Sequence, residues 1–143
     1  MTQEDKQLLL IDLCTRVPHG VKCYVENHYN PLVLLGVEEI YQKMWAFKKG
    51  EYIATFWNDT KRISDIKPYL RPMSSMTEEE YENFIKVLKR SMVCRKCYDR
   101  HEQWIQTPSL EEWLNAHHFD YRELIEKDLA LPAPEGMYNF KND

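Results

Sequence analysis

Hydrophobic residues follow two different spacings along this chain, and the spacing changes near residue 70. Over residues 21–66, apolar positions form short runs or alternate with polar ones, and turn-forming residues separate the runs. Such spacing is typical of short β-strands. From Thr77 onward, apolar residues recur every three or four positions, as they do on one face of an α-helix. The sequence therefore predicts an α+β protein in which the strands precede most of the helices.

The first half is predicted to contain one helix and about five strands. A capping pair, Thr2 and Asp5, begins the helix, and Pro18-His19-Gly20 ends it. Its apolar face is expected to hold Leu9, Leu10, Leu13, Cys14 and Val17. The strands are expected at residues 21–25, 32–35, 40–47, 52–57 and 62–66. We expect them to form a small bent antiparallel sheet or barrel.

A proline-rich stretch is predicted to join the two halves. Pro68 and Pro72 fix φ and remove two backbone donors, so residues 67–72 should form an extended or single-turn connector. The chain then divides into residues 1–72, a helix with a small β-sheet lobe, and residues 73–143, a helical lobe. We expect the second lobe to pack on the first as one compact domain.

The helix after the connector is the strongest local prediction. Thr77 and Glu80 form a capping box, and acidic residues occupy the first turn. Its first apolar stripe consists of Tyr81, Phe84, Ile85, Leu88 and Met92, and a second consists of Cys94, Cys97, Tyr98, His101, Trp104 and Ile105. At 100° per residue the two stripes point roughly 150° apart. Either the helix breaks near Ser91–Cys94, or its second part meets a different body, such as another subunit.

Two further helices are predicted near the C-terminus. Thr107-Pro108-Ser109-Leu110-Glu111-Glu112 resembles a helix start in which Pro108 takes an early helical position. The buried face of this helix should contain Leu110, Trp113, Leu114 and His117. Asp120 and Glu123 form another capping pair, which leads into Leu124 and Ile125. From Leu131 the tail is expected to be irregular.

Composition narrows the functional classes. With 143 residues, 43% hydrophobic and 13% aromatic, the chain can bury a core, and a net charge of −4 gives no general attraction for nucleic acid. No segment approaches the ~20 apolar residues that cross a bilayer, so no membrane partner is expected. The acidic, polar start is unlike a secretory signal. We therefore expect a cytoplasmic protein whose four cysteines are reduced.

A zinc half-site is one hypothesis that these cysteines raise. Cys94, Cys97 and His101 share a face at helical spacing, and His117, His118 or a distant cysteine would have to supply the fourth ligand. Because no second cysteine pair has ligand spacing, we favour cysteines packed in the helix stripe, with no metal and no cofactor.

Basic residues raise a second hypothesis. Lys86, Lys89, Arg90, Lys96 and Arg100 fall on one side of a continuous helix and could hold phosphates, with Trp104 near enough to stack on a base. A solvated face is the more ordinary reading of such a pattern.

Catalysis is disfavoured by the motifs. His117-His118-Phe119-Asp120 contains acid-base residues, but adjacent helical side chains diverge, so packing or capping roles are favoured. There is no glycine-rich phosphate loop and no Gly-x-Ser-x-Gly motif. We expect no enzyme and no catalytic residue.

The favoured function is therefore a non-enzymatic interaction module. Nine tyrosines and four tryptophans exceed what a core of this size needs. The second stripe supplies a candidate interface, Tyr98, His101, Trp104 and Ile105, for a protein partner or a second copy of the chain. A nucleic-acid or anion-binding accessory protein and a small metal protein or enzyme are the alternatives.

Three blocks of the sequence resemble a known family. They are LLLIDLCTRVPHGV (8–21), KPYLRPMSSMTEEE (67–80) and WLNAHHFDYRELIEKDLALPAPEGMY (113–138). They are similar to small uncharacterised proteins encoded by gut bacteria, their phages and mobile elements. The resemblance implies a bacterial, cytoplasmic protein from such a source and implies no activity. In related sequences a Gly often stands where this chain has Asp128, between the last helix and Leu129. Asp tolerates the left-handed conformation less well than Gly, so the helix end expected there is less well defined than in the family.

Overall fold

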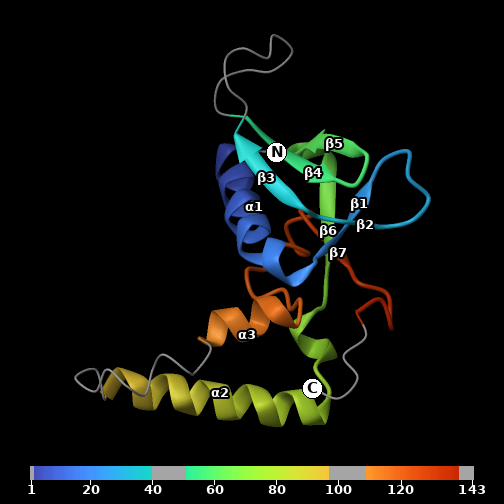
Figure 1. Ribbon diagram of the computed structural model, residues 1–143. Helices are drawn as coiled ribbons and strands as arrows, with labels where there is room; N and C mark the ends of the chain where they lie inside the picture. Colours follow the sequence, from blue (N-terminus) through green and yellow to red (C-terminus); the bar gives the residue numbers. More distant parts are fainter. Residues whose placement is uncertain (1, 40–50, 97–108, 139–143) are drawn as a thin grey trace.

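The computed structural model describes residues 2–39, 51–96 and 109–138, with the backbone alone for residues 91–96, and it confirms the α+β class (Figure 1). The described residues form two long helices, one short helix, three 3₁₀ turns and two small sheets. In chain order the elements are α1 (Gln3–Arg16), η1 (Val17–His19), β1 (Lys22–Val25), β2 (Leu32–Val33), β3 (Gly36–Glu39), β4 (Tyr52–Phe56), β5 (Asp59–Arg62), η2 (Ile63–Asp65), β6 (Ile66–Leu70), η3 (Met73–Ser75), α2 (Glu78–Lys96), α3 (Leu110–Ala116) and β7 (Leu131–Pro132).

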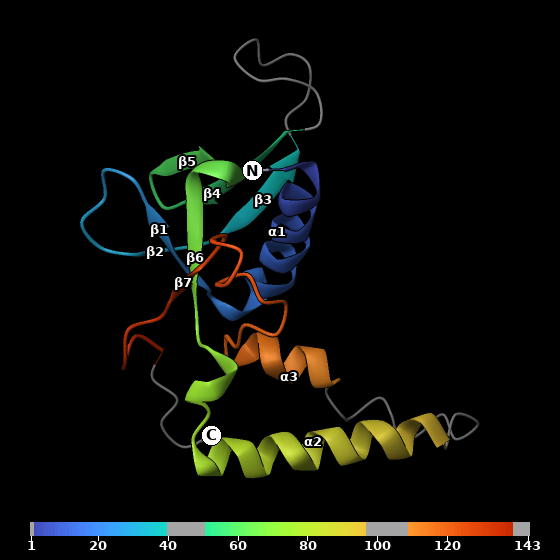
Figure 2. The same ribbon diagram turned by 180° about the vertical axis from the view of Figure 1, so that it is seen from behind.

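The strands form two sheets. One has the order β2-β1-β6-β7, in which only β7 runs parallel to its neighbour, and the other is the antiparallel set β3-β4-β5. α1 lies alongside both sheets, whereas α2 lies at the far end of the molecule with α3 between it and the rest (Figures 1 and 2). This arrangement leaves much of α2 facing solvent.

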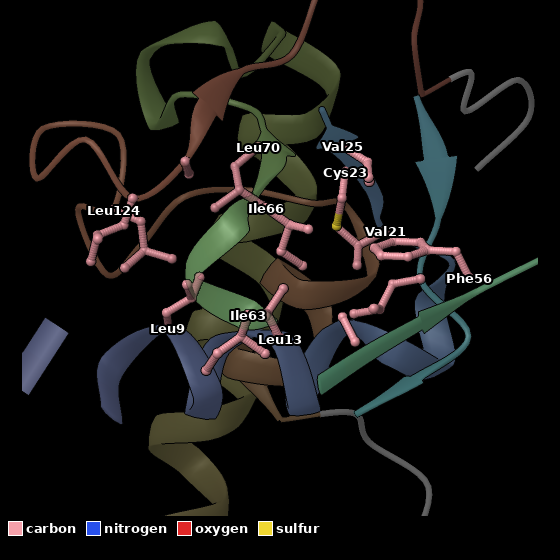
Figure 3. Close-up of a cluster of buried hydrophobic side chains, with 14 residues drawn as sticks. Leu9, Leu13, Val21, Cys23, Val25, Phe56, Ile63, Ile66, Leu70 and Leu124 are labelled. Atoms are coloured by element: carbon pink, nitrogen blue, oxygen red, sulfur yellow. The ribbon is translucent and has the colours of Figure 1, made fainter. Parts of the chain in front are cut away.

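One core joins α1 to both sheets. Its side chains point toward one another from α1, β1, β4, η2 and β6 (Figure 3). Alternation along β1 places Val21, Cys23 and Val25 inside, as predicted. Leu124, Leu129 and Ala130 belong to the same core, so the chain returns to the first sheet after α3.

The predictions for residues 59–72 were wrong in detail. β5 ends at Arg62, so the strand expected at 62–66 is divided between β5, the turn η2 and the start of β6. The expected connector is itself mostly β6, a central strand of its sheet. Pro68 is tolerated there because β7 pairs only from Tyr69 onward and needs no donor from Pro68.

Near the N-terminus the structure confirms the predicted helix start and differs from two other predictions. Thr2 and Asp5 do form the capping box that begins α1. Cys14 is exposed rather than buried, because the buried face of α1 consists of Leu9, Asp12, Leu13 and Arg16. Residues 32–35 are not a continuous buried strand, since β2 ends at Val33 and Leu35 is 53% exposed. The strand expected at 40–47 lies outside the described residues.

Among the helices predicted after residue 76, the start of α2 is confirmed, and the one expected after Asp120 is wrong. Thr77 and Glu80 cap α2 as expected, and α2 continues to Lys96, so a break at Ser91–Cys94 is wrong. Ser109 caps α3, which begins at Leu110, whereas Pro108 lies outside the described residues. The helix expected after Asp120 is absent from the described residues 121–138. The Asp120 carboxylate instead accepts bonds from Leu124 and Ile125 within a series of turns.

Candidate interaction surface

A half-buried ion pair fixes the start of α2 on the sheet. The Arg71 guanidinium donates two hydrogen bonds of 2.6 Å to the Glu80 carboxylate, one from each terminal nitrogen. Arg71 follows β6 directly, and its guanidinium also lies 4.3 Å from the centre of the Phe119 ring. The Glu80 carboxylate additionally accepts a bond from the Thr77 backbone N–H. The first turn of α2 is therefore held in a defined position by charge, stacking and capping together.

Aromatic side chains pack one side of α2 against α3. Phe84 lies 6.0 Å from Trp113 between ring centroids, and the His117 ring stacks on Trp113 at 4.2 Å. Val87 and Phe119 complete this second, smaller core. His117 therefore has the packing role that its helical spacing predicted, and its Nδ1 lies 2.9 Å from the Trp113 carbonyl oxygen.

Beside this packed side lies an open apolar hollow. It has a volume of about 530 Å³, and it is lined by Met73, Ser74, Met76, Glu78, Tyr81, Glu82 and Phe84. Tyr81 is 57% exposed and Met73 is 36% exposed, although both are large apolar side chains. Partly exposed tyrosine and methionine are residue types that protein interfaces favour. We name this surface, formed by η3 and the first turns of α2, the α2 hollow.

Two acidic side chains, Glu78 and Glu82, line the α2 hollow, and Glu79 lies next to them in the first turn of α2. Glu78, Glu79 and Glu82 are exposed, and none makes an ion pair within the described part of the chain. Only Glu80 is paired, with Arg71. The hollow thus combines an apolar floor with an uncompensated negative rim.

The predicted basic face is only partly described. Lys86, Lys89 and Arg90 are exposed on α2, as that hypothesis requires. Lys96 is the last residue of α2, and Arg100 lies outside the described residues. The three exposed cations share a helix with the unpaired glutamates.

Most of the other predicted site residues cannot be placed. Cys97, Tyr98, His101, Trp104 and Ile105 all lie outside the described residues, so the interface and zinc hypotheses remain predictions. Cys94 lies within α2. In residues 2–39, 51–96 and 109–138, no three His, Cys, Asp or Glu side chains are grouped so that they could hold a metal ion. Burial raises the pKa of the Cys23 thiol, which makes it unreactive.

A second exposed aromatic region lies in the β1–β2 loop and the β4–β5 turn. Tyr29 is fully exposed and Trp57 is 78% exposed. His28 Nε2 lies 2.6 Å from Asp59 Oδ2, so this contact joins the β1–β2 loop to the β4–β5 turn (Figure 1). The hydrogen bond from His28 holds the pKa of Asp59 below its ordinary value. These rings offer exposed apolar contact area.

A buried charge network was not anticipated. Asp12 is fully buried and accepts bonds from Arg16 at 2.8 Å and from Arg122 at 2.7 Å. Arg16, also fully buried, donates to the Phe119 carbonyl oxygen. The network joins α1 to the segment after α3. The signal was present in the sequence, because Asp12 and Arg16 share the helical face of Leu9 and Leu13.

His118 is held neutral next to this network. It is 3% exposed, has φ of 62°, and its ring stacks on Tyr138 at 3.8 Å. Burial, with the positive charges of Arg16 and Arg71 nearby, lowers the pKa of His118 to about 3. The Tyr138 hydroxyl accepts a bond from the Lys22 N–H and donates to the Tyr69 carbonyl oxygen. These contacts bind the C-terminal part to β1 and β6.

Comparisons with family models, with curated proteins and with solved structures give no match. Within the described parts of the chain, no helix combines the length and the apolar character that a membrane span requires. We therefore infer the function from the α2 hollow and the residues around it.

Proposed function

We propose that this protein is a non-enzymatic interaction module that binds a protein partner through the α2 hollow. The observation that carries the proposal is a half-exposed tyrosine, Tyr81, in an apolar hollow whose lining glutamates, Glu78 and Glu82, make no ion pair with any described residue. Isolated exposed apolar residues are common on protein surfaces, but a hollow lined by several of them is typical of binding sites.

The lining specifies the chemistry of the partner. Met73 and Met76 have flexible, polarisable side chains that adapt to an inserted apolar group. Glu78 and Glu82 line the same hollow and would attract lysine or arginine beside that group. A partner surface with an apolar anchor flanked by basic residues is therefore the best complement.

The frame around the hollow is suited to recognition. Arg71 and Glu80 fix the first turn of α2, and Phe84 packs on Trp113, so the hollow is formed before a partner arrives. A preformed site loses less conformational entropy on binding than a flexible one.

The acidic rim also argues against the nucleic-acid alternative. A phosphate backbone that approached Lys86 and Lys89 would meet Glu82 on the same helix. The cations of α2 are better matched by a partner that carries both signs of charge.

Site-specific photo-crosslinking tests the proposal. A benzophenone amino acid would replace Tyr81, and in a matched control Tyr24, which is 44% exposed on β1. In cells, we expect one discrete protein adduct from position 81 and none from position 24. The adduct should disappear when Glu78→Lys and Glu82→Lys are added. Equal adducts from both positions, or no adduct from position 81, would contradict the proposal.

A further inference from the structure

Charge is separated along α2. Residues 78–82 contain four glutamates and no base, whereas residues 86–96 contain five basic residues and no acid. The helix dipole favours acids in the first turn and bases in the last turn. It does not account for Glu82, Lys86 and Lys89, which lie in the second and third turns. Their pattern indicates a partner that runs alongside the helix.

A partly exposed apolar stripe accompanies these charges. Tyr81, Ile85 and Leu88 are spaced by four and then three residues, as in a two-helix seam, and none of them is fully buried. At 100° per residue they fall within about 60° of one another. The stripe lies next to the side that packs on α3 and continues the lining of the α2 hollow through Tyr81.

Glu82 and Lys89 lie together on the outer edge of that stripe. They are seven residues apart and so fall within about 20° of each other around the helix. Both are exposed. On a single helix they are two turns apart, too far to pair with each other. Neither makes an ion pair within residues 2–39, 51–96 and 109–138, so both charges along this edge are open to a partner.

An antiparallel copy of α2 satisfies both charges at once. In that orientation Glu82 faces Lys89 of the second copy, and Lys89 faces its Glu82, while Ile85 and Leu88 form the layer between them. A parallel copy would not bring these charges together, because its two-fold axis runs along the helices and places the Glu82–Lys89 edges of the two copies on opposite sides of the pair. Because a two-fold axis repeats every contact, one complementary pair becomes two.

We infer that the partner of the α2 hollow is a second copy of this chain, joined through an antiparallel α2–α2 pair. This inference rests on the proposed function, since it names the occupant of that surface. The position of α2 at the end of the molecule leaves room for such an approach (Figures 1 and 2). The 19 residues of α2 give a helix about 28 Å long, enough for four heptad-type layers.

Charge reversal tests the pairing by solution mass. Light scattering of the purified chain should give twice its 17.3 kDa mass. Glu82→Lys and Lys89→Glu, made singly, should each place two like-charge contacts in the interface. Each should weaken the dimer about tenfold or more. The double variant Glu82→Lys with Lys89→Glu restores both attractions and should recover the dimer. Circular dichroism of each variant establishes that it is folded.

A monomeric wild type, or single variants as dimeric as the wild type, would overturn the inference. A monomer that still gives a discrete adduct with a different protein from position 81 would leave the proposed function intact. A monomer without any adduct from position 81 would remove both.

Discussion

Both oxygens of the Glu80 carboxylate accept hydrogen bonds from Arg71, at 2.6 Å each, and this pair fixes the point where α2 leaves the sheet. Arg71 belongs to the segment after β6, and Glu80 to the first turn of α2. The side chains are 16% and 15% exposed, so water screens the pair only in part. The orientation of the α2 hollow relative to the body depends on this contact.

Acid should weaken that contact. Burial by itself would raise the pKa of Glu80, but hydrogen bonds from Arg71 and Thr77 outweigh it and hold the pKa below its ordinary value. Since the folded-state pKa is depressed, the stability that Glu80 contributes is complete above its unfolded pKa. It is lost as the pH falls through the folded value. We expect Glu80→Gln to lower the free energy of unfolding at pH 7 by about 1–3 kcal/mol.

Urea denaturation between pH 7 and pH 3 checks this prediction. The difference between wild type and Glu80→Gln should shrink as the pH falls. Glu79→Gln is the matched control in the same helical turn, exposed and without an ion-pair partner in the described chain, and should change stability by less than about 0.5 kcal/mol. A difference that stays constant with pH would show that the Arg71–Glu80 charge pair is unimportant.

His118 should make the fold sensitive to mildly acidic pH. Its folded pKa of about 3 lies well below the ordinary value of 6.5. Between those two values the unfolded chain binds the proton and the folded chain does not, so stability falls as the pH falls below 6.5. The slope from this residue is up to about 1.4 kcal/mol per pH unit. His118→Asn tolerates the positive φ and should flatten the slope between pH 6.5 and 5. An unchanged slope in the variant would assign the effect to other groups.

Asp12 is predicted to be the most sensitive carboxylate of the α1 region. Asp12→Asn leaves the buried Arg16 without its counter-charge and should cost about 3–5 kcal/mol. Asp128→Asn is the control, because Asp128 pairs with Lys67 at 2.9 Å but its side chain is 86% exposed. That change should cost at most about 1 kcal/mol. Chemical denaturation measures both values, and similar losses in the two variants would refute the distinction.

Asp128 also adopts a left-handed conformation, with φ of 59°. Asp128→Gly and Asp128→Ala both remove the contact with Lys67, but only glycine takes this conformation without strain. We expect the glycine variant to be more stable than the alanine variant by about 1 kcal/mol. Thermal melting of the pair checks this order, and an alanine variant as stable as the glycine variant would contradict it.

The sequence predicts a helix or strand correctly where a single local rule determines it. The capping boxes at Thr2 and Thr77 begin α1 and α2, and alternation along residues 21–25 gives β1. Where tertiary contacts decide, the sequence was misleading. Pro68 suggested a connector, yet β1 recruits its segment as a central strand. Asp120 caps a turn rather than a helix, since Leu124 and Leu129 must return to the first core.

The aromatic content predicts an interaction role, which stays a prediction. The sequence does not point to the α2 hollow, because Met73 and Met76 precede the predicted helix and lie outside its apolar stripe. Only the η3 turn brings them beside Tyr81. The resemblance to phage and gut bacterial proteins stays a prediction.

Mixing the two charge-reversed variants tests most directly whether α2 pairs with a second copy of the chain. Glu82→Lys carries positive residues at positions 82 and 89, and Lys89→Glu carries negative residues at both. If α2 pairs antiparallel with a second copy, each variant should be a monomer alone. An equimolar mixture should then form a heterodimer of twice the 17.3 kDa chain mass by light scattering. A mixture that remains monomeric, although the wild type is a dimer, would show that α2 does not form the interface.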